Sequence, residues 1–353
     1  MKFYAVIPVY NVAEYITEFL ESLIMQDDTD ISYILINDGS TDNSGSICDE
    51  YAQRDNRLIV KHTANQGVSK ARNTGLEIVL KEGNDNDYVL FFDPDDYLTS
   101  PQAISLIRRN LSQLPDILTY NHLSNNKPAS QNIKTGGNFE GKEIGQKLFP
   151  SYLCGKLING DRINSGLFQS AFSLGVIRRN NIRFREDIRK AEDTLFYAQF
   201  LTYVNRAVLA NITPYNYRIR SNSLTTTYRK PSEIGARKGI SILNELRYWG
   251  LKCKGIDVMA FESFMVFKYR KVFENYSIGL SDFNNKDSLF EKYSNLTEFC
   301  KFPVVQEIKK IILSDHASIP RKIRNAMILP PPILFSYGLV YNILKHFKNK
   351  IHN

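Results

Sequence analysis

Tyr88-Val89-Leu90-Phe91-Phe92-Asp93-Pro94-Asp95-Asp96 joins five consecutive apolar residues directly to three carboxylates. A short apolar run that is bounded by polar residues is typical of a strand buried on both faces. Strands of this kind belong to parallel sheets, in which helices cover both faces. The stretch therefore predicts a buried strand that ends at an acidic turn.

Around this strand, β-rich runs alternate with segments of helical spacing. We expect further strands at residues 3–9, 33–36 and 58–61, and helices at residues 14–25, 44–53 and 67–80. In the first helix the apolar residues recur at intervals of three and four, which is the helical period. The alternation predicts parallel βαβ units, so the expected fold class is α/β. A strand at residues 116–120 and helical segments at 234–276, 289–293 and 304–313 are expected to follow.

Polar residues gather where three of the expected strands end. The segments are Pro8-Val9-Tyr10-Asn11, Asn37-Asp38-Gly39-Ser40-Thr41-Asp42 and Asp93-Pro94-Asp95-Asp96. Ligands of such sheets bind beyond the carboxyl ends of the strands. We therefore expect the three segments to converge on one rim and to form the functional site there.

Two carboxylates at positions i and i+2 after a strand can face one pocket if the turn bends there. Asp93 and Asp95 suit a hard divalent cation, Mn²⁺ or Mg²⁺, whose other ligands are diphosphate oxygens. Such a cation neutralises the charge that develops on a leaving nucleoside diphosphate. The alternative is a solvated acidic turn or a helix N-cap, which an isolated motif of this kind would favour. The buried strand before it and the two neighbouring rim segments favour the metal site.

Asp38 and Arg72 are candidates for nucleotide binding. A carboxylate at the end of the second strand can accept a hydrogen bond from a base imide or a ribose hydroxyl, and the alternative is a turn aspartate. An arginine at the start of a helix can reach a phosphate or a uracil carbonyl, and the alternative is a surface cation.

Four motifs in this order resemble glycosyltransferase family 2. They are Ile7-Pro8-Val9-Tyr10-Asn11, Asn37-Asp38-Gly39-Ser40-Thr41-Asp42-Asn43-Ser44, Asn65-x-Gly67-x-Ser69-x-Ala71-Arg72-Asn73-x-Gly75 and Phe92-Asp93-x-Asp95-Asp96. The resemblance implies the GT-A fold, a Rossmann-like and mainly parallel sheet flanked by helices. It also implies a nucleotide-sugar donor, usually UDP-linked, a divalent cation, and inversion at the anomeric carbon.

The resemblance also divides the chain. We expect a GT-A domain over residues 1–230, with a nucleotide-binding half at 1–110 and an acceptor half at 111–230. A mostly helical C-terminal region is expected over residues 231–319, followed by a basic amphipathic tail over residues 320–353.

Individual roles follow from the matching positions. The expected donor-binding residues are Pro8, Tyr10, Asp38, Arg72, Asp93 and Arg218. Pro8 and Tyr10 are expected in the nucleobase pocket, and Arg218, within Tyr215-x-Tyr217-Arg218, is expected to stabilise the leaving group. Asp95 is expected to hold the metal directly, with Asp93 shared between the metal and the ribose. Asp96 is expected to be structural.

An inverting transfer needs a base that takes the proton of the attacking hydroxyl. Lys190-Ala191-Glu192-Asp193 resembles the Glu-Asp motif of the family, which implies that Asp193 is the base, with Glu192 as the neighbouring alternative. The competing interpretation is an acidic pair that stabilises the first turn of a helix. Where related bacterial proteins carry a lysine-containing segment, this chain has Asn164-Ser165-Gly166-Leu167-Phe168-Gln169, so the acceptor subsite is expected to differ.

The excess positive charge is concentrated at the C-terminal end. Residues 308–353 contain eight Lys and Arg against one acid, Asp315, while the whole chain has a net charge of +8. After Pro330-Pro331-Pro332, an amphipathic stretch with a basic edge suits an anionic membrane surface. The alternatives are a helix that packs on the enzyme or a dimer contact. Because the charge lies beside apolar residues and there is no nucleic-acid-binding motif, we expect no nucleic-acid partner.

The expected function is transfer of a sugar to a glycan or lipid-linked acceptor in bacterial surface polysaccharide synthesis, such as O-antigen, lipooligosaccharide or capsule. Four dispersed cysteines argue against a zinc cluster or a disulfide framework and suit a reducing cytosol. We expect a cytoplasmic protein that lies on the inner face of the cell membrane. The alternatives are a sugar nucleotidyltransferase, which would show a Gly-rich phosphate loop after the first strand, and a non-catalytic GT-A partner protein.

Overall fold

The computed structural model describes residues 1–129, 133–154, 163, 166–188, 191–219 and 233–262, with single positions beyond these up to residue 306. The chain divides into two compact units, Met1–Ser221 with Trp249–Ile256 and Asn222–Tyr248 with Asp257–Asn353. The expected tail at residues 320–353 lies outside the described residues, as do most of the helical segments expected at 289–293 and 304–313.

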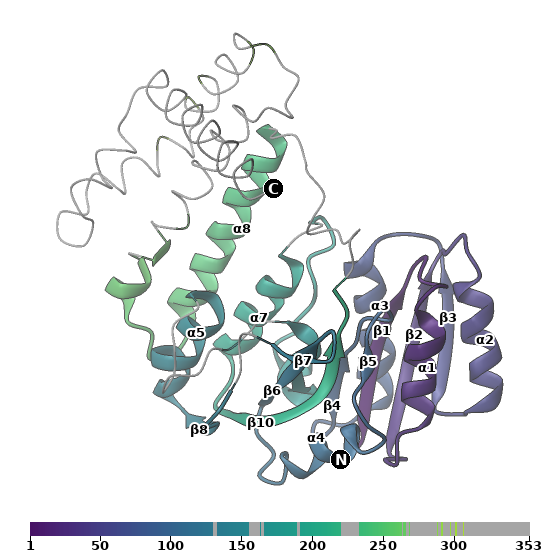
Figure 1. Ribbon diagram of the computed structural model, residues 1–353. Helices are drawn as coiled ribbons and strands as arrows, with labels where there is room; N and C mark the ends of the chain where they lie inside the picture. Colours follow the sequence, from purple (N-terminus) through teal and green to yellow (C-terminus); the bar gives the residue numbers. More distant parts are fainter. Residues whose placement is uncertain are drawn as a thin grey trace, which may run out of the picture. The chain divides into compact units, whose positions relative to one another are not determined.

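A ten-stranded sheet forms the centre of the first unit (Figure 1). Its main order is β3-β2-β1-β4-β9-β6-β10-β5, with β7 paired to β6 and β8 paired to β10. The strands are β1 (Phe3–Val9), β2 (Ile31–Asp38), β3 (Leu58–Thr63), β4 (Tyr88–Phe91), β5 (Tyr97–Leu98), β6 (Ile117–Ser124), β7 (Lys127–Pro128), β8 (Gly137–Glu140), β9 (Ser170–Ser173) and β10 (Arg206–Tyr217).

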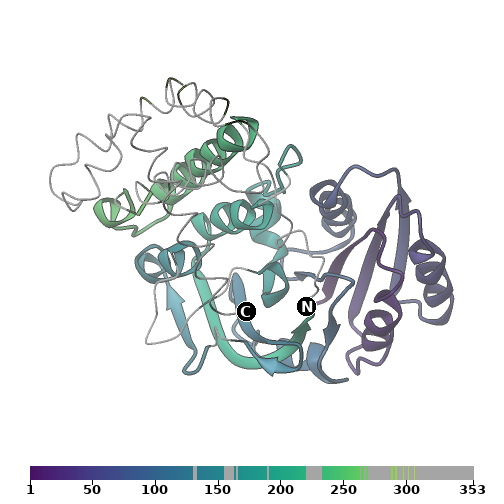
Figure 2. The same cartoon turned by 45° about the horizontal axis from the view of Figure 1, so that its top comes forward.

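Helices cover both faces of this sheet, as the alternating pattern predicts. In the first unit they are α1 (Ile16–Ile24), α2 (Ser44–Arg54), α3 (Val68–Glu82), α4 (Ala103–Arg109), α5 (Phe149–Cys154), α6 (Leu174–Arg179) and α7 (Glu192–Thr202), with a π-helical turn at Ile144–Leu148 and a 3-10 turn at Leu167–Gln169. The helix α8 (Glu233–Lys252) belongs mostly to the second unit. Figure 2 shows α1 and α2 on one side of strands β1 to β3 and α3 on the other.

Successive side chains of β1 point to opposite faces of the sheet. Phe3, Ala5 and Ile7 belong to one core with Phe19 and Leu23 of α1. On the other face, α3 lies so close to the sheet that a Cβ at Gly75 would be 2.5 Å from Cγ1 of Val6. Glycine at this position therefore permits the close approach of α3 to β1.

An aromatic cluster joins α7 to the same face as α3. Phe91 of β4 makes edge contacts with Phe172, Phe184 and Phe196 at centroid distances of 5.8, 5.1 and 5.4 Å. Phe196 lies on α7 and stacks on Phe184 at 4.3 Å. The burial of these rings fixes the start of α7, and with it the Glu-Asp pair, relative to the end of β4.

The half of the sheet that the sequence predicts is confirmed, and the other half is more mixed. β1 pairs in parallel with β2 and β4, and β2 pairs in parallel with β3. β9 is antiparallel to both β4 and β6, so it reverses the strand direction within the sheet. β10 returns parallel to β6, with a register irregularity between Ala210 and Tyr215.

The first unit also includes the chain from Trp249 to Ile256. The Thr202 hydroxyl at the end of α7 donates to the Trp249 carbonyl at 3.1 Å, and Tyr203 makes an edge contact with the Trp249 ring. The predicted helical region after residue 231 begins with α8 at Glu233. Within the described part of the chain, every helix is too short or too polar to cross a bilayer.

Candidate functional site

The loops after β1 and β2 are tied together at the rim of the sheet. The Asn11 side-chain oxygen accepts the Thr41 N–H at 2.8 Å, and the Ser44 hydroxyl accepts the Val12 N–H at 2.9 Å. Asn11 has a φ of 50°, a left-handed conformation that asparagine tolerates better than most residues. The preceding residue, Tyr10, is 47% exposed, whereas Pro8 is buried within β1.

Asp38, the last residue of β2, is only 3% exposed. Its two carboxylate oxygens accept the N–H groups of Gln66 and Gly67 at 2.9 and 2.8 Å. Gly67, which precedes α3, has a φ of 95° and open space where a Cβ would stand. Asp38 therefore shapes the loop before α3, and its oxygens keep further acceptor capacity for a ligand.

Arg72 links two acidic groups that are distant in the sequence. Its guanidinium donates to Oδ1 of Asp93 at 3.0 Å and to Oε1 of Glu192 at 3.2 Å. Arg72 is only 7% exposed and lies over the ring of Phe184. The sequence predicts that Arg72 binds a ligand. In the structure, its guanidinium also connects the acidic turn to α7.

Two buried polar atoms in the first turns of α3 are unpaired among the described residues. They are the Ser69 hydroxyl oxygen and Nε of Arg72. Buried polar groups normally have a partner, so an unpaired one in a native fold calls for an explanation such as a ligand or a water molecule. Both atoms lie in the motif that the sequence connects with a nucleotide.

Asp93-Pro94-Asp95-Asp96 forms a tight turn after β4. The Asp96 N–H donates to the Asp93 carbonyl at 3.1 Å. Asp96 is fully buried and accepts the Tyr215 hydroxyl at 2.7 Å and the Arg218 N–H at 2.8 Å. Burial, and then the charges of Asp93 and Asp95, raise the pKa of Asp96 well above its usual value. The Asp93 side chain is more open, at 35% exposed.

The Arg218 side chain holds the outside of this turn. Its Nε donates to the Asp95 carbonyl at 2.9 Å, and its guanidinium forms an ion pair with Glu18 of α1. The rings of Tyr15 and Tyr97 lie 5.3 and 5.4 Å from the guanidinium carbon. The sequence predicts that Arg218 stabilises a leaving group, and the structure places its side chain against the acidic turn and α1.

The Glu-Asp pair opens α7. Ala191, directly before it, has a left-handed φ of 65°. The Asp193 carboxylate accepts the Thr194 N–H at 2.7 Å, while Glu192 turns to Arg72. Burial raises the pKa of Glu192, the charge of Asp193 adds to the increase, and the Arg72 guanidinium opposes it. The structure therefore brings Glu192, Arg72 and Asp93 together, with Asp193 next to Glu192 in the same helical turn.

Two contributors were not predicted from the sequence. In the sequence, Glu18 resembles an ordinary surface acid of α1. Only its ion pair with Arg218 shows that it contributes to the site. Tyr215 stands in the Tyr-x-Tyr-Arg segment, but no sequence signal indicates that its hydroxyl contacts Asp96.

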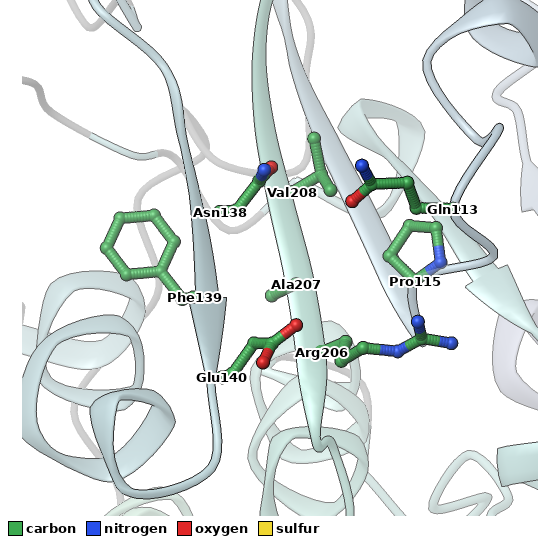
Figure 3. Close-up of a pocket in the computed structure, with 8 residues that line it drawn as sticks. All are labelled: Gln113, Pro115, Asn138, Phe139, Glu140, Arg206, Ala207 and Val208. Carbon is green, nitrogen blue, oxygen red and sulfur yellow. The ribbon is translucent and has the colours of Figure 1, made fainter.

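A small pocket lies elsewhere in the first unit (Figure 3). It is lined by β8, by the start of β10 and by the segment before β6, including Glu140, Arg206 and Gln113. Because β6 and β10 begin there, the pocket lies at the opposite end of these two strands from the Tyr215–Arg218 contacts with the acidic turn. It is therefore separate from the candidate site.

Comparison with known proteins supports the same fold. Residues 1–349 of TarS from S. aureus, in a crystal structure with UDP, align with a TM-score of 0.65 at 18% identity, covering 99% of this chain and 92% of that one. This likeness shows a shared fold, the GT-A fold that the motifs predict.

Sequence comparison identifies the family of this chain. EpsJ, an uncharacterized glycosyltransferase of Bacillus subtilis (strain 168), is 32% identical over 231 residues, which are 64% of each chain. TarS of Staphylococcus aureus (strain Mu50 / ATCC 700699), a poly(ribitol-phosphate) beta-N-acetylglucosaminyltransferase, is 28% identical over 66% of this chain and 38% of its own. The match thus spans less than two thirds of either relative. The family model of glycosyl transferase family 2 matches residues 4–213, more than half of the chain. The chain belongs to glycosyltransferase family 2.

Proposed function

We propose that this protein transfers a sugar, with inversion, from a UDP-linked donor to a hydroxyl group of a glycan or lipid-linked acceptor. The observation that carries the proposal is the Arg72 bridge, which brings Asp93 of the acidic turn and Glu192 of the Glu-Asp motif to one guanidinium. The acidic turn after β4 lies in one half of the domain, and the acidic N-terminus of α7 lies in the other. Arg72 therefore brings the two into one site.

The α3 end of the site suits a nucleoside diphosphate. The helix has no side-chain cap at its N-terminus, and its first turns hold the unpaired atoms of Ser69 and Arg72. The N-terminus of a helix attracts anions, because its free N–H groups and its dipole both favour negative charge. The open space at Gly67 lets a ligand approach this backbone closely.

Asp93 and Asp95 fit a divalent cation in their chemistry. Both provide hard oxygen ligands, and Mg²⁺ is commonly held by one or two carboxylates with substrate phosphates. Among the described residues, no group of three His, Cys, Asp or Glu side chains could hold a metal without such help. Bound Mn²⁺ or Mg²⁺ would neutralise charge on the departing diphosphate.

In the proposed reaction, Asp193 takes the proton from the acceptor hydroxyl as its oxygen attacks the anomeric carbon. The bond between that carbon and the donor phosphate breaks on the opposite face, and UDP leaves. Glu192 keeps Arg72 in place beside Asp93. The uncapped start of α3 and the Arg72 guanidinium bind the diphosphate in this scheme.

The biological setting that we propose is bacterial surface polysaccharide synthesis, such as O-antigen, lipooligosaccharide or capsule, at the cytoplasmic face of the membrane. The names of the relatives support the surface-polysaccharide part of this setting, and they include TarS and the minor teichoic acid biosynthesis protein GgaB of Bacillus subtilis (strain 168). The UDP and UDP-GlcNAc complexes of TarS support a UDP-linked donor in the same way.

A panel of nucleotide-sugars with Mn²⁺, Mg²⁺ or EDTA tests the proposal. We expect UDP release from at least one UDP-sugar, dependent on the cation and increased by an acceptor glycan. Asp193→Asn should lower kcat by about 10²- to 10⁴-fold without weakening UDP binding. Formation of pyrophosphate would instead indicate a nucleotidyltransferase, and an inert chain would indicate a non-catalytic partner protein.

A further inference from the structure

Tyr215 of β10 is fully buried beneath the acidic turn. Its hydroxyl donates to Oδ2 of Asp96 at 2.7 Å and accepts the Asp93 N–H at 3.1 Å. One hydroxyl therefore contacts the first and the last residue of the turn. The Arg218 N–H, three residues further along the chain, donates to the other oxygen of Asp96 at 2.8 Å.

The backbone of β10 reinforces this attachment. β5, which follows the turn directly, pairs antiparallel with β10, with Leu98 opposite Tyr215 and Tyr97 opposite Asn216. The Thr99 N–H donates to the Pro214 carbonyl at 3.0 Å. The turn is thus held by β10 through side-chain and backbone contacts, while Asp93 and Asp95 remain partly exposed.

The Tyr215 ring packs against two other aromatic rings. It stacks on Phe92 at a centroid distance of 5.4 Å and on Phe168 at 4.8 Å, with interplanar angles of 29° and 15°. Phe168 also stacks on Tyr217 at 5.5 Å. Because two neighbouring rings stack on this buried ring, the hydroxyl has little freedom to move away from the turn.

Tyr88 shows what an ordinary buried tyrosine does in this fold. It is 2% exposed, and its hydroxyl donates to the Pro115 carbonyl. Both tyrosines bury an aromatic ring and satisfy one hydroxyl, so both contribute to folding. They differ in their partners, because only the Tyr215 hydroxyl contacts the turn that carries Asp93 and Asp95.

We propose that Tyr215 is a positioning residue, whose hydroxyl holds the Asp93–Asp96 turn in the conformation that binds a divalent cation and a nucleoside diphosphate. The inference rests on the proposed function, since it assumes that Asp93 and Asp95 meet these ligands. Groups that orient metal ligands typically influence metal affinity or activity by about 10- to 100-fold.

The test uses the full chain and the variant Tyr215→Phe, which removes the hydroxyl and keeps the stacked ring. Titration calorimetry measures UDP binding in the presence of Mn²⁺, and electron spin resonance measures Mn²⁺ binding with and without UDP. We expect Tyr215→Phe to weaken both by about 10- to 100-fold. The control Tyr88→Phe loses one buried hydroxyl as well and should bind like the wild type, with a comparable fall in stability.

Asp96→Asn weakens the same hydrogen bond from the other side and provides the test if Tyr215→Phe does not fold. If both variants fold, the double variant should bind UDP and Mn²⁺ no more weakly than the weaker single variant. Additive losses would mean that the two residues act separately.

Several results would overturn the positioning role. They are wild-type binding in Tyr215→Phe, equal losses in Tyr88→Phe, and independent losses in the double variant. A wild-type chain that binds Mn²⁺ but no UDP would overturn the proposed donor alone, and the Mn²⁺ titration would then decide the role of Tyr215. A wild type that binds neither would overturn both proposals.

Discussion

Arg72 is the residue on which the two acidic parts of the site depend. Its side chain and that of Glu192 are 8% and 14% exposed, so their ion pair is buried. A buried charge needs a partner, since the interior solvates it poorly. Arg72 therefore contributes to stability as well as to the proposed donor binding, and the two contributions can be measured separately.

Arg72→Met should destabilise the fold, because it leaves Glu192 without its partner. Removal of one member of a buried ion pair typically lowers the free energy of unfolding by about 3–5 kcal/mol. The matched control is Lys70→Met on the same helix, whose pair with Glu186 is largely exposed and should contribute less than about 1 kcal/mol. Urea denaturation measures both, and equal effects would contradict the buried bridge.

The raised pKa of Glu192 predicts a pH dependence of stability. A carboxyl whose pKa is higher in the folded state contributes stability that is complete below its unfolded pKa, near 4.5, and is lost as the pH rises through its folded pKa. Between about pH 4.5 and neutrality, we therefore expect the free energy of unfolding to fall more for the wild type than for Glu192→Gln. Urea denaturation over a pH series measures the difference, and parallel curves would exclude this contribution.

At the scale of elements, α3 organises the site. Its Arg72 reaches β4 and α7, and the Asn73 side chain exchanges hydrogen bonds of 2.9 Å with the N–H and carbonyl of Phe184, in the segment before α7. These contacts require α3 to lie close to β1, which Gly75 makes possible. The distance between this helix and the sheet therefore determines whether the acidic groups meet.

Gly75→Ala tests the close packing of α3 on β1. Two effects of opposite sign on stability compete in this variant. Helix propensity alone predicts a gain of about 1 kcal/mol for alanine over glycine. The new Cβ would lie 2.5 Å from Val6, however, and such overpacking typically destabilises by about 1–3 kcal/mol. We expect a net loss in thermal denaturation and weaker UDP binding. Thr74→Ala, beside it on α3, is the control, and a more stable Gly75→Ala variant would refute the tight packing.

At the scale of the whole molecule, the charge distribution predicts that the protein binds an anionic membrane surface. Residues 308–353 carry most of the net positive charge, and their tail lies outside the described residues. We expect the full chain to co-sediment with anionic liposomes at low salt, and less so at high salt, because ions screen the attraction. A chain without residues 328–353 should lose this binding. If it still co-sediments, the tail is not the membrane contact.

Local patterns were sufficient to predict the first half of the sheet and the rim. The strand and helix periods identify β1 to β4 and α1 to α3, with differences of a few residues at their ends. Because parallel strands place their carboxyl ends on one side, the positions of Tyr10, Asp38 and the acidic turn followed from the order of the elements. The four motifs then indicated the family, which the family match confirms.

The tertiary structure alone decided which side chains meet. Arg72 contacts Glu192 across 120 residues, and Tyr215 contacts Asp96 across 119. These pairings depend on the antiparallel insertion of β9 and on the return of β10 beside β6. No local period encodes such contacts, since they arise only when the packed sheet and its aromatic cluster bring distant segments together. The sequence by itself thus determined which polar side chains gather at the rim, and the packing determined how they are held.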